Sequence, residues 1–358
     1  MKSDRTSAKL KNVYRTPLEK TDRIAFIRLD KNECSLQLPQ RILTEIQQSV
    51  TPEYLGCYPE VYKLYRELES FHNLPEESIL VAAGSDGAIR AAFDAFVSPG
   101  DEVINIHPNF AMYEVYSHLR EAIQINIGYN PQSLALDVSE VIARINRRTA
   151  VLVLSNPNSP TGVEIPQEDL EIILNAAERY ETRVIVDEAY YPFSDRTSVR
   201  FLGSYDNLIV LRTFSKAFGL AGLRVGYALS SKENIELMGK SKPMYEINTL
   251  GVLCACTYVK NYELVRESVK EYLTVKEWFV ESTESLGLSV ISGSANFVNI
   301  VVGRDHVQEL VGRFREKSIL IRPGYPWGVL EDCIRISIGN KDDMRCAFDV
   351  LKRWKNDG

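Results

Sequence analysis

Asn207-Leu-Ile-Val-Leu211 runs directly into Arg212-Thr-Phe-Ser-Lys-Ala-Phe-Gly-Leu-Ala-Gly-Leu-Arg-Val-Gly-Tyr227. The first segment is a short apolar run, typical of a strand buried on both faces. The second has the hydroxyls, glycines and charges of a loop at a strand end. The runs Ala150–Leu154 and Arg183–Val186 have the same apolar character. Strands buried on both faces occur mostly in parallel sheets between helices, so these segments predict an α/β fold.

Strands and helices alternate along the first two thirds of the chain. Weaker strand candidates lie at Ile79–Ala82 and Glu102–Ile106, and a helix is expected over Ala88–Phe96. A helical stripe between two of the strong strands is formed by Leu170, Ile173, Leu174, Ala177 and Tyr180. We therefore expect a mostly parallel sheet covered by helices on both faces. Ligands of such sheets bind beyond the carboxyl ends of the strands.

The C-terminal third predicts a second, smaller α/β unit. A long helical tract covers about residues 250–286, and three strand candidates follow it at residues 296–302, 319–322 and 333–338. The chain of 358 residues has room for two domains. The expected division is an N-terminal arm at 1–28, part of the small domain at 29–50, a large domain at 51–249 and the small C-terminal domain at 250–358.

Composition excludes several classes of protein. Hydrophobic content of 45% and charged content of 25% are ordinary for a soluble domain, and the net charge of −6 argues against non-specific nucleic-acid binding. The six cysteines are scattered without a zinc-ligand spacing, as in a reducing cytoplasm. No signal core and no apolar run of about 18 residues occurs. We expect a cytoplasmic protein without metal, membrane span or nucleic-acid partner.

The polar residues after the two strongest strands indicate one kind of chemistry. Lys216 has the amine that holds an aldehyde as a Schiff base, and it lies among small residues and the hydroxyls of Thr213 and Ser215. Asp187 directly follows the apolar run Val184–Val186 and can face a pyridinium nitrogen, and Tyr190 can face a ring oxygen. Together they describe a pyridoxal phosphate site, in which the protein orients and tunes the cofactor.

A phosphate site is expected beside these residues. Ser85 and Asp86 follow Gly84 at a predicted helix start, where free backbone N–H groups attract anions. Ser215 adds a hydroxyl and Arg224 a fixed positive charge.

From about Leu29 to Gly339 the chain resembles the fold type I pyridoxal phosphate aminotransferases, most of all the histidinol-phosphate aminotransferase group. The motifs that carry the resemblance are Leu29-Asp-Lys-Asn-Glu33, Tyr58-Pro-Glu60, Gly84-Ser-Asp86, Pro108-Asn-Phe-Ala-Met-Tyr113, Asn158-Ser-Pro-Thr-Gly162, Asp187-Glu-Ala-Tyr190, Arg212–Tyr227, Pro243-Met-Tyr-Glu-Ile-Asn248 and Arg335-Ile-Ser-Ile-Gly339. The region from Asp187 to Gly226 is the most specific of them.

The resemblance implies roles for the cofactor residues. Asp187 is expected to pair with the pyridine nitrogen, and Tyr190 to donate to the ring O3′. Lys216 is expected to form the Schiff base and then move the substrate proton as a base and an acid. Phe110 is expected to stack on the ring. Tyr58 matches a tyrosine that reaches the phosphate of the neighbouring subunit, which implies a homodimer with composite active sites.

The resemblance also implies a substrate end. Arg335 matches the arginine that receives the substrate carboxylate, a task suited to its planar fork. Further candidates at this end are Arg322, Asn32, Tyr245 and Tyr14.

The chain departs from the family pattern at a position beside the cofactor. Ser159 stands where the family usually has an asparagine that bonds O3′, with Asn156 and Asn158 close by. Which of the three polar residues contacts the cofactor stays open at this point. Glu246 also departs from a common asparagine and adds an anionic candidate near the substrate end.

The expected activity is amino transfer between an amino acid, with glutamate as first candidate, and a small amine or ketone such as histidinol phosphate. Decarboxylation of a phosphorylated amino acid is the alternative, because it uses the same cofactor residues and differs in which substrate bond stands perpendicular to the ring. A non-catalytic binding module of the same fold is a second alternative, disfavoured by the presence of Lys216.

Overall fold

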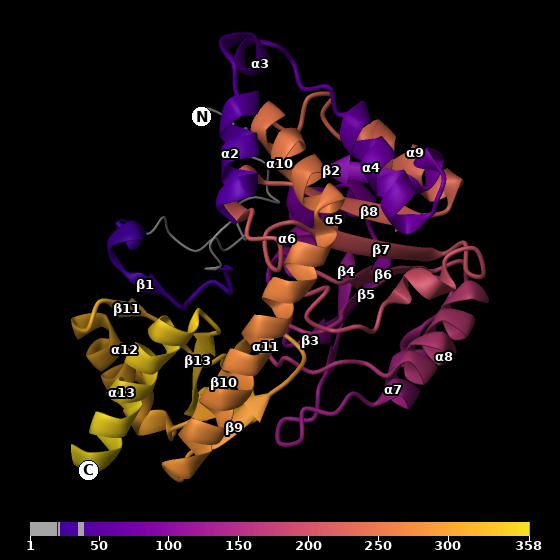
Figure 1. Ribbon diagram of the computed structural model, residues 1–358. Helices are drawn as coiled ribbons and strands as arrows, with labels where there is room; N and C mark the ends of the chain where they lie inside the picture. Colours follow the sequence, from indigo (N-terminus) through magenta and orange to yellow (C-terminus); the bar gives the residue numbers. More distant parts are fainter. Residues whose placement is uncertain (1–19, 21, 35–38, 358) are drawn as a thin grey trace, which may run out of the picture.

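The computed structural model describes residues 20, 22–34 and 39–357. Within these residues, seven strands form one sheet in the order β2-β8-β7-β6-β5-β3-β4 (Figure 1). The strands are β2 Ile79–Ala82, β3 Glu102–His107, β4 Ile123–Gly128, β5 Thr149–Ser155, β6 Arg183–Asp187, β7 Leu208–Thr213 and β8 Gly226–Ser230. The five strands expected from the sequence all lie in this sheet, and β4 and β8 join them.

The sheet is mostly parallel, as predicted. Each pairing among β4, β3, β5, β6 and β7 is parallel, whereas β8 runs antiparallel to both of its neighbours, β7 and β2. The carboxyl ends of β5, β6 and β7 therefore meet at one edge of the sheet.

Helices cover both faces of this sheet because successive strand residues point to opposite sides. Val151 and Val153 of β5 pack with α5, α6 and α9, whereas Leu152 and Leu154 pack in the cluster that includes α4, α7, α8 and α10. The predicted fold class is confirmed. These helices are α4 Tyr62–His72, α5 Gly84–Phe96, α6 Met112–Leu119, α7 Val138–Arg144, α8 Gln167–Glu178, α9 Lys232–Ser241 and α10 Thr249–Lys260.

A second, smaller sheet lies in the C-terminal part (Figure 1). Its four strands within the described ranges pair antiparallel in the order β12-β13-β10-β9. They are β9 Ser289–Ser292, β10 Phe297–Val301, β12 Arg322–Pro323 and β13 Cys333–Ser337, and the helices packed around them are α11 Tyr262–Ser285, α12 Arg304–Glu316 and α13 Lys341–Asp357. The helical tract expected near 250–286 is two helices, α10 and α11, with Asn261 between them.

The segment before the large sheet contacts both parts of the molecule. Strand β1, Ile27–Arg28, pairs in parallel with β11, Ile319–Leu320, and Leu29 hydrogen bonds to Leu320 and Ser337. Helix α2, Gln40–Ser49, lies beside α10 (Figure 1). The domain boundaries stay a prediction, and most of the expected arm lies outside the described residues. The remaining short elements are α3 Pro52–Gly56, η1 Arg23–Ala25, η2 Glu76–Ser78, η3 Ser198–Phe201, η4 Ala221–Leu223 and η5 Gly328–Asp332.

Candidate active site

A cavity of about 540 Å³ lies where the carboxyl ends of β5, β6 and β7 face the small sheet. Most of the site residues expected from the sequence line it. These are Asn32, Ser85, Asp86, Phe110, Ser159, Asp187, Tyr190, Thr213, Ser215, Lys216, Arg224, Arg322 and Arg335.

Asp187 is the buried acid of the cavity. It is the last residue of β6, its Oδ2 accepts a hydrogen bond of 2.8 Å from the Tyr113 hydroxyl, and its Oδ1 accepts one of 3.0 Å from the backbone of Ala189. Burial raises the pKa of Asp187 to about 6, against the lowering effect of these two donors. Because burial disfavours the charged carboxylate, a cationic partner such as a pyridinium would stabilise it.

Lys216 and Tyr190 lie together on the cavity wall. The Lys216 Nζ donates a hydrogen bond of 3.0 Å to the backbone oxygen of Lys31, and it lies 5.9 Å from the centre of the Tyr190 ring. The Tyr190 hydroxyl accepts a hydrogen bond of 2.8 Å from the amide of Asn32. The adjacent residues Lys31 and Asn32, distant in sequence from both Tyr190 and Lys216, therefore hold the amine and the phenol in place.

The first turn of α5 forms an anion cradle together with Ser215 and Arg224. No side chain caps this helix start, and an Arg224 Nη1 donates to the Ser215 hydroxyl at 3.3 Å. Gly226 lets β8 approach the helix start closely, since a Cβ there would lie 2.4 Å from the Ser85 nitrogen. Free amides, a hydroxyl and a guanidinium at a helix start are the donor set that suits a phosphate.

A second cationic end is formed by Arg322 and Arg335, which are paired across β12 and β13. Arg335 donates from Nη2 to the backbone of Asp30 at 2.9 Å, but its buried Nε has no hydrogen-bond partner among the described residues. Burial lowers the pKa of Arg335, and the nearby charge of Arg322 acts in the same direction. An anionic ligand would supply the missing partner.

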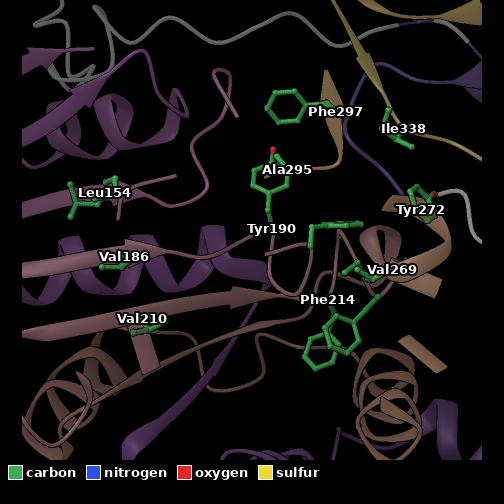
Figure 2. Close-up of a cluster of buried hydrophobic side chains, with 14 of the residues drawn as sticks. Leu154, Val186, Tyr190, Val210, Phe214, Val269, Tyr272, Ala295, Phe297 and Ile338 are labelled. Carbon is green, nitrogen blue, oxygen red and sulfur yellow. The ribbon is translucent and has the colours of Figure 1, made fainter. Parts of the chain in front are cut away.

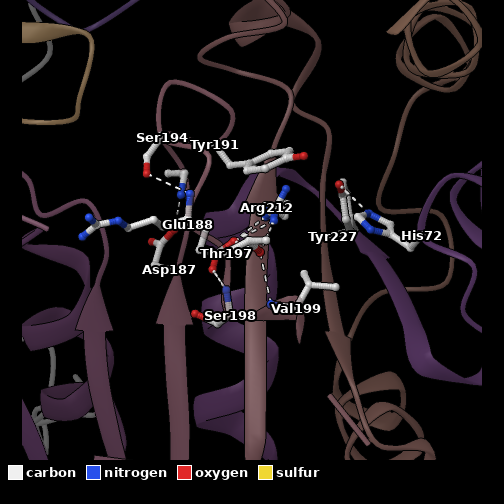
Figure 3. A network of polar contacts seen from close by, with 12 residues as sticks. His72, Asp187, Glu188, Tyr191, Ser194, Thr197, Ser198, Val199, Arg212 and Tyr227 are labelled. Atoms are coloured by element: carbon white, nitrogen blue, oxygen red, sulfur yellow. Dashed lines mark hydrogen bonds and ion pairs between the residues drawn. The ribbon is translucent and has the colours of Figure 1, made fainter. Parts of the chain in front are cut away.

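A buried ion pair ties the ends of β6 and β7 together behind the cavity (Figure 3). Arg212 Nε donates to Glu188 Oε2 at 2.8 Å, and the Tyr191 ring lies 3.3 Å from the guanidinium carbon. Thr197 also donates to this carboxylate, at 2.9 Å. Glu188 follows Asp187 and Arg212 precedes Thr213, so the pair fixes the positions from which both cavity residues project.

Five predicted residues lie off the cavity wall. The Asn156 side chain accepts from the backbone of Ile165, and the Asn158 amide donates to the Pro108 carbonyl. Both amides therefore stabilise the loop around Ser159. Of Asn156, Asn158 and Ser159, it is Ser159 that lines the cavity. Gly84 contributes backbone at the helix start. Tyr58 and Tyr245 are exposed and stack on each other with ring centres 4.0 Å apart.

Tyr14 and Glu246 were also expected near the substrate end. Tyr14 lies outside the described residues. Glu246 does not line the cavity: its Oε1 lies 2.6 Å from the place of a Cβ on Gly87, against the side of α5.

The cavity wall also includes residues for which no role was predicted. Tyr113 and Lys31 lie inside motifs that carry the resemblance, so a polar side chain in a site motif was an available signal. Asn299 and Tyr325 also line the cavity, but no local pattern marks them.

The described part of the chain holds neither a cluster of His, Cys, Asp and Glu side chains that could bind a metal ion nor a helix long and apolar enough to cross a membrane.

Comparisons with known proteins identify the family of this chain. The family described as aminotransferase class I and II matches residues 24–351. A histidinol-phosphate aminotransferase of Caldanaerobacter subterraneus subsp. tengcongensis is 35% identical, over 91% of this chain and 92% of the relative. One from Thermoanaerobacter pseudethanolicus is 34% identical over the same shares.

Solved structures share the fold. The histidinol-phosphate aminotransferase of Sinorhizobium meliloti in complex with pyridoxal 5′-phosphate has a TM-score of 0.88 and 23% identity, and the alignment covers 99% of this chain and 98% of that one. These findings favour amino transfer over the decarboxylase and binding-module alternatives. The chain belongs to the class I and II aminotransferase family, and it is a transaminase whose cofactor is pyridoxal phosphate.

Proposed function

We propose that the chain transfers an amino group between glutamate and histidinol phosphate or a closely related small amine. The observation that carries the proposal is a single cavity whose wall includes Lys216 and Asp187 together with arginines at two ends, Arg224 and Arg335. One end suits the cofactor phosphate and the other suits an anionic group of the substrate. The name shared by the most similar relatives supports histidinol phosphate as the amine.

At the cofactor end, each proposed contact follows from the donors on the wall. Pyridoxal phosphate, when bound, supplies the electron sink that allows a substrate α-carbon to lose a proton. Asp187 would hold the pyridine nitrogen in its charged form, and Tyr190, whose hydroxyl accepts a hydrogen bond from the Asn32 amide, would donate to the ring oxygen. Phe110 covers the ring. We assign the phosphate to the backbone N–H groups of Ser85 and Asp86 in the first turn of α5, with the side chains of Thr213, Ser215 and Arg224.

Lys216 moves the proton. Its Nζ hydrogen bond to the Lys31 carbonyl holds the amine at the cavity wall. From there the amine would take the proton from the substrate α-carbon as a base and deliver it as an acid to the cofactor carbon C4′, a transfer that a positioned side chain typically accelerates by about 10²–10⁴-fold.

At the substrate end, we assign the carboxylate of glutamate and the phosphate of the amine to the same two arginines. Arg335 has an unpartnered buried Nε, and Arg322 stands opposite it across the strand pair. Since like charges opposite each other repel, binding an anion between them is favourable.

Histidinol phosphate is expected to be used at least about 10-fold more efficiently than histidinol, because a hydrogen bond to a charged group contributes about 1.5–3 kcal/mol. The measurement is kcat/KM for glutamate formation from 2-oxoglutarate with each amine. Equal values of kcat/KM for the two amines would show that Arg322 and Arg335 do not bind the phosphate of the substrate. Release of carbon dioxide from a phosphorylated amino acid, without amino transfer, would favour decarboxylation instead.

We further propose a homodimer with composite sites. Tyr58 is 71% exposed, lies off its own cavity and stacks on the exposed Tyr245. Leu55, Tyr62 and Met244, close to these two in sequence, are exposed apolar side chains that we take with them as one apolar patch. Exposed apolar patches of this kind mark protein interfaces. In the proposed dimer, Tyr58 reaches the cofactor phosphate of the partner subunit.

Tyr58→Phe is expected to release the cofactor at least about 5-fold faster, because one hydrogen bond to phosphate is lost. Mixed dimers of Tyr58→Phe and Lys216→Ala subunits distinguish the two arrangements. If Tyr58 acts across the interface, each mixed dimer regains one site with both native residues and retains cofactor there at the native rate. Retention at the Tyr58→Phe rate in the mixed dimer, or a monomer in sedimentation, would contradict the composite site. Tyr62→Phe, in the same patch, is the matched control.

The domain division belongs to the same proposal. The large cofactor-binding domain covers residues 51–249, and the small domain covers residues 250–358 with the segment 29–50. The compartment proposed from the scattered cysteines is the cytoplasm, and Cys57, Cys254, Cys256, Cys333 and Cys346 form no disulfide.

A further inference from the structure

Lys276 is a buried lysine outside the cavity. It lies on α11 with 6% of its surface exposed, and its Nζ donates hydrogen bonds to the carbonyls of Gly293 and Ala295, the latter at 2.8 Å. No carboxylate forms an ion pair with it in the part of the chain that the structure describes. A buried unpaired ammonium is costly, and a residue such as methionine would fill the space without that cost. Filling space in the core therefore does not explain why a charged side chain stands at this position.

The two carbonyls belong to the turn between β9 and β10. This turn packs against the loop of residues 159–164, which contributes Ser159 and Pro160 to the cavity wall. The Ser294 amide donates to the Gly162 carbonyl at 2.9 Å, and the Ser294 hydroxyl donates to Glu164 at 3.0 Å. The approach is so close that a Cβ on Gly293 would lie 1.9 Å from the Gly162 oxygen. The position of the turn thus sets the position of the loop that carries Ser159 and Pro160 to the cavity.

The same turn begins β10, which forms part of the substrate end. Asn299 of β10 lines the cavity, donates to the Pro160 carbonyl at 3.1 Å and stands opposite Arg335 in the strand pairing. Phe297 packs its ring edge-on to Tyr190, 5.7 Å between centres, and Figure 2 shows both rings with Ala295 of the turn. A shift of the turn would move Asn299 and the Pro160 wall relative to Arg335.

We propose that Lys276 is a positioning residue for the substrate: its ammonium holds the Gly293–Ala295 turn, and through it the wall formed by Pro160 and Asn299 beside Arg335. The inference rests on the proposed placement of the substrate carboxylate at Arg335. It predicts that Lys276 governs the KM for the amino acid and leaves cofactor binding unchanged.

The proposed role is pH-dependent. Burial lowers the pKa of Lys276 to about 8, so the ammonium that makes the stronger, charge-assisted bonds is present below that pH and is lost above it. The titratable groups joined to the turn or close to Lys276 along its helix are Glu164, which accepts from Ser294, the buried Tyr272, and the exposed Glu271 and Glu277. The KM for the amino acid is therefore expected to rise between pH 7 and pH 9.

The test compares Lys276→Met, Lys276→Arg and the exposed Lys270→Met of the same helix in the cofactor-loaded enzyme. Lys276→Met is expected to raise the KM for glutamate at least about 10-fold at pH 7, to change kcat less than about 3-fold, and to retain pyridoxal phosphate through dialysis as the native enzyme does. Lys276→Arg, which stays charged, is expected to keep a low KM from pH 7 to pH 9. Titration of the substrate amine is common to all the enzymes and cancels in their comparison.

Three results would overturn the inference. The first is a native KM for glutamate in Lys276→Met. The second is an equal loss in kcat, KM and stability, which would mark a merely structural lysine. The third, decisive even if Lys276→Arg fails to fold, is an identical pH profile of KM in the native enzyme and Lys276→Met. The first result would leave a preference for histidinol phosphate over histidinol untouched, whereas absence of that preference would overturn the proposed substrate alone.

Discussion

Lys216→Ala is expected to reduce transamination by at least about 10³-fold while the fold is retained. The variant loses the amine that we propose moves the substrate proton, and general acid–base catalysis of this kind contributes about 10²–10⁴-fold. The structural cost is small, because the side chain makes its hydrogen bond to the Lys31 carbonyl at the edge of an open cavity.

Mass measurement after borohydride reduction identifies the lysine that binds the cofactor. The native chain, loaded with pyridoxal phosphate and reduced, should gain the mass of one cofactor, and Lys216→Ala should gain none. Lys31→Ala is the matched control, since Lys31 also lies on the cavity wall, and it should still be labelled. Covalent label on Lys216→Ala would mean that another lysine holds the cofactor, and the central assignment would be wrong.

Asp187→Asn is expected to cost far more activity than Tyr190→Phe and yet to stabilise the cofactor-free protein. An amide cannot balance the charge of a pyridinium, whereas loss of the Tyr190 hydroxyl removes one hydrogen bond worth about 1 kcal/mol, or roughly 5-fold. Rates of Asp187→Asn equal to those of the native enzyme would exclude a protonated ring nitrogen held by Asp187.

The stability effect follows from the raised pKa of Asp187. The folded protein holds this proton up to about pH 6, and an unfolded aspartate loses it near its ordinary pKa of 3.8. The contribution of the group to stability is therefore full below pH 3.8 and is lost as the pH rises through 6, a change of about 3 kcal/mol. Asp187→Asn has no such titration. Urea unfolding of the cofactor-free proteins at pH 5 and pH 8 should show a smaller decline for the variant, and equal declines would contradict a buried, uncompensated carboxylate.

Much of the large sheet could be predicted from the sequence because its central strands are local apolar runs. β5, β6 and β7 are buried on both faces, so each reads as a continuous apolar segment. β4 was missed because it is an edge strand with partly exposed residues. β8 was missed because Gly226-Tyr-Ala-Leu-Ser230 contains small and polar residues and follows a glycine-rich loop.

The sequence by itself determined which residues bring the chemistry to the cavity, because a motif at the carboxyl end of a parallel strand is placed by that strand. Asp187 and Tyr190 at the end of β6 and Lys216 after the end of β7 are of this kind. Only the tertiary structure decided the contacts around them: Tyr113 on Asp187, Asn32 on Tyr190, and Lys276 on the Gly293–Ala295 turn. It also turned the Asn156 and Asn158 amides into the loop and left Ser159 on the wall. A local sequence pattern predicts the strand or turn in which a residue lies. These contacts join segments far apart in the chain, and only the packing of those segments brings the partner atoms within hydrogen-bond distance.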